Sequence, residues 1–260
     1  MADPCLAGEE LLERGFAYFR AGPPDKRTAW AVAREVFAAA AQRAGALDLP
    51  PLETVGEFSV PPAGALRRDF QALHIDFGLP IDGCEGVDVA RFTALYVESR
   101  HPPTTAFTRV VPLRALLGQR EWPSRRTLLG RLRSYGAGGY AGSGYVEGIL
   151  ARLVEAADGC SALPSTGEPG FLCGMEFSSV PEERAHFARH GLRLDSVERR
   201  IALRPGELLL FDNLAIAHGR VGTRRPEELH QLCVGYRGLG TIGQRAVLDS
   251  VLDAFAAANE

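Results

Sequence analysis

The stretch that decides the fold of this 260-residue chain is Leu208-Leu-Leu-Phe-Asp-Asn-Leu-Ala-Ile-Ala-His218-Gly-Arg220. Its first four residues are all apolar, which fits a strand covered on both faces or a buried helical turn. The turn signal Pro205-Gly206 just before them favours the strand. Asp212-Asn213 then interrupts the apolar run, and a second run leads to His218. The stretch therefore predicts a buried strand that ends at a polar site.

A short upstream segment, Leu73-His-Ile-Asp-Phe77, also places polar residues among apolar ones. His74 is the only histidine of the six that has an acidic residue, Asp76, two positions later. Residues two apart in a strand point to the same face, so the imidazole and the carboxylate would project together. A distant His218 could complete a set of three. The pattern also fits a surface or core histidine that is hydrogen-bonded to a neighbouring carboxylate.

Two histidines and one carboxylate on one face of a metal form the facial triad of non-haem Fe(II) oxygenases. Such a set leaves coordination positions open for a cosubstrate and for oxygen. The three residues His74, Asp76 and His218 are therefore candidate metal ligands.

These motifs resemble those of the taurine dioxygenase and clavaminate synthase superfamily of Fe(II)/2-oxoglutarate oxygenases. The resemblance covers roughly residues 65–237, and it is carried by Leu73–Asp76, by Pro102-Pro-Thr-Thr-Ala-Phe107, by Gly206–Asn213 and by His218-Gly219-Arg220. It implies that His74, Asp76 and His218 bind Fe(II) and that 2-oxoglutarate is the cosubstrate.

The resemblance also implies residues that contact 2-oxoglutarate. A family threonine that contacts its carboxylate matches Thr105 best, with Thr104 as the rival, although threonine also simply favours strands. The family arginine that pairs with the far carboxylate falls 13 to 15 residues after the distal histidine, where this chain has three uncharged residues, Gln231, Leu232 and Cys233.

Another arginine must take that role if 2-oxoglutarate is used. Arg237 lies about 16 Å along the strand from Leu232 and has the opposite parity. Arg220 shares the face of His218 if the strand continues, roughly 7 Å along. We therefore expect Arg220, with Thr105, to bind the cosubstrate. Arg224 and Arg225 are alternatives, and Arg220 could instead pair with a surface carboxylate.

The many short predicted strands with clustered helices indicate a mainly β fold with flanking helices. The family resemblance narrows this to a double-stranded β-helix, or jelly-roll, barrel. We expect a single oxygenase domain over residues 1–260: N-terminal helices in 1–50, a barrel core over 65–237 with a helical insertion at about 111–157, and a C-terminal helix at 243–258.

Composition limits the partners and the compartment. A hydrophobic content of 46% with 23% charged residues is that of an ordinary globular protein, and a net charge of −3 gives no general attraction to nucleic acid or anionic membranes. The start of the chain lacks the basic and apolar regions of a signal peptide. Five cysteines without Cys-x-x-Cys spacing indicate reduced thiols. We expect a cytoplasmic protein whose partners are a small-molecule substrate and O2.

Three functions follow. The first is an Fe(II)-dependent dioxygenase, an oxidoreductase that uses 2-oxoglutarate to hydroxylate or otherwise oxidise a small molecule such as an amino acid or a natural-product intermediate. The second is a non-haem iron oxygenase that does not use 2-oxoglutarate. The third is a non-catalytic ligand-binding barrel, which an intact triad argues against.

Overall fold

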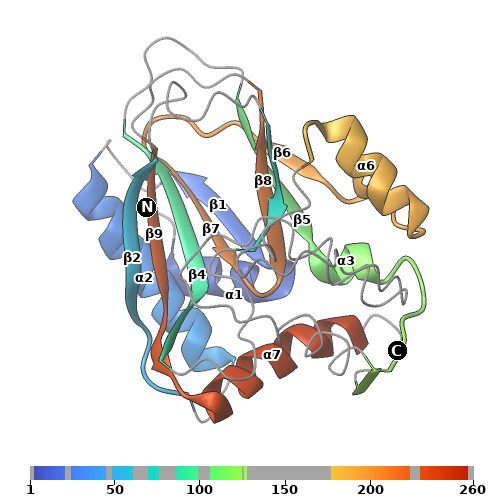
Figure 1. Cartoon of the computed structure of the whole chain (residues 1–260). Coiled ribbons are helices and arrows are strands. Elements are labelled where there is room, and N and C mark those ends of the chain that lie inside the picture. The colour runs from blue at the N-terminus through green and yellow to red at the C-terminus, as the bar shows by residue number, and fades with distance from the viewer. Residues whose placement is uncertain are drawn as a thin grey trace.

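The computed structural model describes residues 3–20, 25–44, 49–60, 70–75, 86–98, 106–124, 126–127, 177–222 and 229–256. Its strands form two antiparallel sheets flanked by helices (Figure 1). The five-stranded sheet has the order β1 (Phe16–Arg20), β7 (Glu207–Asp212), β4 (Val87–Val97), β9 (Leu229–Leu239), β2 (Glu53–Val60). The four-stranded sheet has the order β3 (Phe70–His74), β8 (Ile216–Val221), β5 (Phe107–Pro112), β6 (Arg199–Ile201). The prediction of a mainly β fold with flanking helices is confirmed, and the described strands do not close into a barrel.

The two sheets pack face to face through one buried apolar cluster. Its members come from both sheets: Leu95, Val97, Val110, Leu203, Leu209, Phe211, Ile216 and Leu229. Leu208 and Leu210 alternate with Leu209 and Phe211 and lie in a separate cluster on the outer face of the five-stranded sheet. Strand β7 is therefore covered on both faces, as its unbroken apolar run predicts.

Helices cover the outer face of each sheet. The helices α1 (Pro4–Arg14) and α2 (Lys26–Arg43) pack on the five-stranded sheet, where Phe37 stacks on Phe92 with 5.0 Å between the ring centroids. A third apolar cluster lies behind the outer face of the four-stranded sheet and the end of β9. Four helices complete it: α3 (Leu113–Leu117), α6 (Val180–Arg189), the short 3-10 helix η1 (Leu194–Ser196) and α7 (Thr241–Ala256). None of the described helices is long and apolar enough to span a bilayer.

The boundaries differ from the expected ones in the N-terminal part. Residues 16–20 form strand β1 rather than part of the N-terminal helices, and β2 adds residues 53–60 to the sheets before the expected start at 65. Gly15, with φ 80°, ends α1, and the aromatic residues Phe16, Tyr18 and Phe19 favour a strand, which pairs with β7. This short strand was not predicted because it lies between two helical segments.

The expected helical insertion at about 111–157 is only partly described. Residues 107–112 belong to β5, and α3 follows directly at Leu113–Leu117. Residues 128–157 lie outside the described part of the chain. The C-terminal helix is present as α7, at Thr241–Ala256.

The polar pair Asp212-Asn213 builds the turn between β7 and β8. One carboxylate oxygen of Asp212 accepts from Arg91 Nη2 at 2.7 Å, and the other accepts from the Leu214 backbone N–H at 2.9 Å. The Asn213 side-chain amide donates to the Ala90 carbonyl at 3.1 Å. These contacts fix the turn that leads from the buried strand into the strand that carries His218.

A β-bulge shapes the end of β3. Gln71 lies opposite Arg220 of β8 and His74 lies opposite His218, so Ala72 and Leu73 together oppose the single residue Gly219. In a regular strand, residues three apart point to opposite faces, but the extra residue of a bulge restores the same face. The bulge therefore turns His74 toward the space between the sheets, together with Gln71.

Gly219 is the residue that makes room for this bulge. A Cβ at this position would lie 2.6 Å from the Gln71 carbonyl oxygen and 3.0 Å from that of Ala72. Real Cβ atoms do not come that close to backbone oxygens, so any side chain here would push β3 away from β8.

We predict that Gly219→Ala destabilises the protein by about 1–3 kcal/mol, because overpacking forces the backbone to shift. The change would be read as a lower urea midpoint at unchanged m-value. Gly8→Ala in α1 is the control, since its Cβ would meet no atom closer than 3.4 Å and alanine favours helix. Equal stability of Gly219→Ala and the parent would contradict the close contact.

Candidate metal centre

Two of the three predicted metal ligands lie side by side in the structure. His74 ends β3 and His218 lies directly opposite on β8. Their ring centroids are 4.2 Å apart, with 49° between the ring planes. Both side chains are buried, at 1% and 6% exposure. Two imidazoles from distant parts of the chain thus share one small space, at a distance that a single ion can bridge.

The hydrogen bonds of His74 fix which ring nitrogen can bind a metal. Its Nδ1 lies 2.9 Å from the Ala72 carbonyl oxygen. A carbonyl oxygen only accepts, so Nδ1 carries the proton and Nε2 keeps its lone pair. The Nε2 atom lies 3.3 Å from Nε2 of Gln71, an amide that can donate to it. A histidine whose Nδ1–H is held by a backbone carbonyl has the arrangement usual for a metal ligand.

His218 lies against apolar neighbours. Its ring contacts Phe211 of the five-stranded sheet, with 4.5 Å between centroids, and Val110 of β5 is its cross-strand partner. Both neighbours belong to the cluster between the two sheets. An apolar surround limits the access of water to a metal site and strengthens the electrostatic interactions within it.

The remaining predicted residues divide into two groups. Asp76, Thr104 and Thr105 lie outside the described residues, Asp76 in the gap 76–85 and the two threonines in the gap 99–105. Within the described ranges, no group of three or more His, Cys, Asp and Glu side chains is placed to hold a metal ion. The facial triad with Asp76 therefore stays a prediction.

Arg220, the predicted cosubstrate residue, lies on β8 two residues beyond His218. It is 8% exposed, and its cross-strand partners are Gln71 on β3 and Thr108 on β5. Strand alternation gives Arg220 the face of His218, roughly 7 Å along the strand. The sequence reading missed Gln71 and Thr108. Thr108 could have been found from its parity with Val110, whereas Gln71 shares the face only because of the bulge.

The β9 positions where the family arginine is expected, 231–233, carry uncharged side chains. Gln231 Nε2 donates to Cys233 Sγ at 3.4 Å, and Thr93 Oγ1 lies 3.8 Å from the same sulfur. Arg237 is exposed and donates through Nε and Nη2 to the Thr54 carbonyl at 3.0 and 2.7 Å. Arg237 thus lies against β2, away from the paired histidines.

Comparison with known proteins gives structural similarities only. No family model and no curated protein matches the chain. Solved structures similar to it include a taurine dioxygenase from Burkholderia xenovorans, at 17% identity over 94% of this chain and 86% of that one, with a TM-score of 0.43. An asparagine oxygenase in complex with Fe(II), hydroxyasparagine and succinate has 15% identity over 91% and 78%, with a TM-score of 0.45. PvcB, an Fe, alpha-ketoglutarate dependent oxygenase, has 15% identity over 89% and 80%, with a TM-score of 0.46. All three identities are below 25% and all three TM-scores are below 0.5, so these similarities assign neither a family nor an activity.

We predict that His74→Ala and His218→Ala each abolish binding of Fe(II) or Co(II) while the protein stays folded, because the ligands of such a site act as a set. Asp76→Ala should do the same if it is the third ligand. Binding would be measured by anaerobic calorimetry and folding by circular dichroism. His230→Ala is the control, since His230 is a buried imidazole beside Glu98, at 3.2 Å. Full metal binding by His218→Ala would exclude this centre.

Proposed function

We propose that this chain is a non-haem Fe(II)/2-oxoglutarate-dependent dioxygenase that hydroxylates or otherwise oxidises a small molecule. The observation that carries the proposal is the buried pair of histidines on neighbouring strands, with Nδ1 of His74 held by the Ala72 carbonyl. The similarity of the motifs to the superfamily gives the pair a chemical role. Amino acids and natural-product intermediates are the substrate classes that the resemblance suggests.

The proposed architecture is a double-stranded β-helix in which the two described sheets are the two walls. Support comes from their face-to-face packing and from the position of the histidine pair between them. A ligand held between two walls is screened from water on both sides, and small-molecule sites are usually concave and mostly apolar. The described interior has this character around Phe211 and Val110.

In this proposal His74, His218 and Asp76 hold Fe(II). Bound Fe(II) with 2-oxoglutarate would supply the oxidation of a substrate C–H bond by O2. The chain's own part is to fix the imidazole orientations, to exclude water through the apolar neighbours of His218, and to place the substrate. Gln71, whose amide lies 3.3 Å from Nε2 of His74, would be displaced by a bound metal or would contact a ligand beside it.

Arg220 is the residue that we propose pairs with the far carboxylate of 2-oxoglutarate, with Thr105 as the threonine that the resemblance implies. Its burial and its parity with His218 support this role. A charge-assisted pair between arginine and a carboxylate is stronger when it is screened from water. Among the described residues, Thr108 is the threonine beside Arg220 and offers a second hydroxyl donor.

The neutral set Gln231, Cys233 and Thr93 favours a second candidate, a non-haem iron oxygenase that does not use 2-oxoglutarate. Gln231 and Cys233 hydrogen-bond to one another, and neither brings a charge to the interior face of β9. In that case the substrate itself would chelate the metal, and Arg220 would bind an acidic group of the substrate.

We predict that Arg220→Ala weakens 2-oxoglutarate binding at least about 30-fold, because loss of a buried charge partner costs at least about 2 kcal/mol. The measurement is an anaerobic titration of the Fe(II) protein that follows the metal-to-ligand charge-transfer band in the visible. Arg237→Ala is the matched control, since that arginine is exposed and bonds Thr54.

The outcomes of this titration test the role of Arg220 and the use of 2-oxoglutarate separately. An unchanged affinity in Arg220→Ala would remove Arg220 from the cosubstrate site. A parent protein that binds Fe(II) but shows no charge-transfer band with 2-oxoglutarate would favour the oxygenase that works without this cosubstrate.

A further inference from the structure

We infer that Glu183 of α6 is a positioning residue for His74, acting through the bulge of β3, and that Arg109 of β5 holds the Glu183 carboxylate in place for this task. The inference rests on the proposed function, because it assigns a role toward the metal ligand His74. Neither residue touches the histidine pair directly, and both lie on the outer side of the four-stranded sheet.

The link between Glu183 and His74 is a hydrogen bond to the bulge itself. The extra residue of a bulge leaves the ladder locally disrupted, with a backbone group that needs another partner. Here the Leu73 N–H donates to Glu183 Oε1 at 2.6 Å. Leu73 immediately precedes His74, so a carboxylate far away in the sequence fixes the peptide that sets the direction of the histidine side chain.

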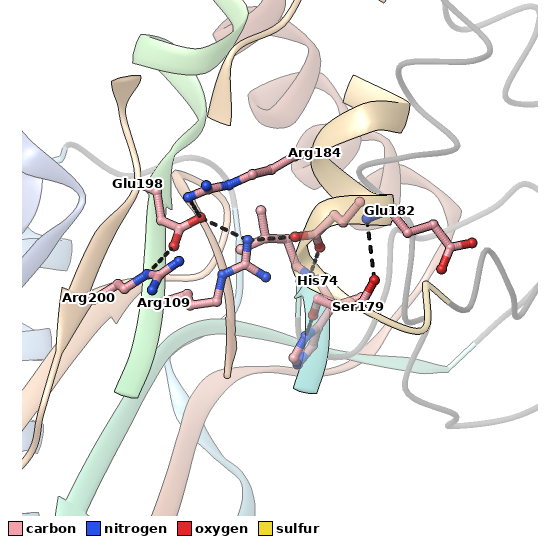
Figure 2. Close-up of polar contacts among 10 residues, drawn as sticks. His74, Arg109, Ser179, Glu182, Arg184, Glu198 and Arg200 are labelled. Carbon is pink, nitrogen blue, oxygen red and sulfur yellow. Dashed lines mark hydrogen bonds and ion pairs between the residues drawn. The ribbon is translucent and has the colours of Figure 1, made fainter. Parts of the chain in front are cut away.

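The carboxylate is held by a buried network of charges. Glu183 Oε2 lies 2.5 Å from Arg109 Nη2, and both side chains are fully buried. The same Nη2 donates to Glu198 Oε2 at 2.9 Å, and Glu198 also contacts Arg200 at 2.7 Å and Arg184 at 3.7 Å (Figure 2). The Arg109 guanidinium lies 5.6 Å from the centroid of the Phe70 ring, at the start of β3.

The helix that carries Glu183 is fixed at its first turn. The Ser179 hydroxyl accepts from the Glu182 backbone N–H at 3.4 Å (Figure 2). The Glu182 carboxylate accepts from the N–H and the hydroxyl of Ser178 at 2.8 and 2.6 Å. Phe187, one turn later, is buried in the cluster behind the four-stranded sheet. A capped and packed first turn allows little freedom to the carboxylate of Glu183.

The charges in this network are costly to bury. Burial raises the pKa of Glu183, and the Arg109 charge offsets only part of that effect. Burial also raises the pKa of Glu198, but hydrogen bonds from Arg109 and Arg200 lower it more, so the net pKa of Glu198 is lowered. Arg109 Nε and Nη1 are buried and have no hydrogen-bond partner among the described residues.

Stability alone therefore gives little reason for this ion pair. Replacing a buried ion pair by apolar side chains of similar size is often neutral or stabilising. What an apolar pair cannot provide is the acceptor for the Leu73 N–H. The specific contribution of Glu183 is the geometry of the bulge, and outer partners of metal ligands typically change metal affinity by about 10- to 100-fold when they are lost.

The test compares Co(II) binding by the parent protein and by the double variant Glu183→Met/Arg109→Met, in which Glu198 keeps Arg200. Affinity would be measured by calorimetry, coordination by the visible Co(II) spectrum, and stability by urea unfolding. We expect Co(II) affinity to fall about 10- to 100-fold with a changed spectrum, whatever the change in stability. In the metal-free protein, amide exchange at Leu73 should become faster.

Two further variants separate positioning from stability. Glu183→Gln keeps an oxygen acceptor for Leu73 and should retain most of the Co(II) affinity that the double variant loses. Phe37→Leu removes packing behind the five-stranded sheet, where Phe37 stacks on Phe92, so it should lower stability without changing Co(II) affinity. Unchanged Co(II) affinity and an unchanged spectrum in the double variant would overturn the positioning role of Glu183 and leave the proposed function standing. A parent protein that binds no Co(II) would overturn the proposed function and this inference with it.

Discussion

The close approach of the β3 bulge to Gly219 is the constraint on which the candidate site depends. Two residues of β3 oppose this one glycine, and the carbonyl oxygens of Gln71 and Ala72 occupy the volume that any side chain there would need. The bulge brings His74 onto the same face as Gln71 and opposite His218. Without it, the parity of β3 would turn the histidine toward the helices.

The polar groups around the candidate site lie on both faces of the four-stranded sheet, and we propose a different role for each face. On the inner face, His74, His218 and Arg220 line the space between the sheets, next to the apolar side chains of Phe211 and Val110. On the outer face, Glu183 accepts from the backbone of the bulge and pairs with Arg109. The candidate metal ligands and the residues that we infer to position His74 therefore lie on opposite faces of the same sheet.

The sequence was informative where local patterns coincide with the fold. The unbroken run Leu208–Phe211 predicted a strand buried on both faces, and this strand is present as β7. His74 and His218, which the motifs singled out, lie opposite one another, but their role as metal ligands stays a prediction. Strand β1 was missed although Gly15 and Gly22-Pro23-Pro24 flank it, because it has only five residues and its pairing with β7 is a tertiary contact.

The supporting residues could not be found from sequence. In the sequence, Glu183 is an ordinary acidic residue in the first turn of a helix, where the helix dipole stabilises a negative charge. Only the fold shows that its carboxylate accepts a hydrogen bond from Leu73. Gln71 has the wrong strand parity for the site unless the bulge is known. The most direct test of the central claim is anomalous X-ray diffraction from crystals loaded with Fe(II) or Mn(II). The account predicts one strong anomalous peak about 2.0–2.2 Å from a ring nitrogen of both His74 and His218, the usual distance for an imidazole ligand. A peak elsewhere, or none between these two rings at full metal loading, would contradict it.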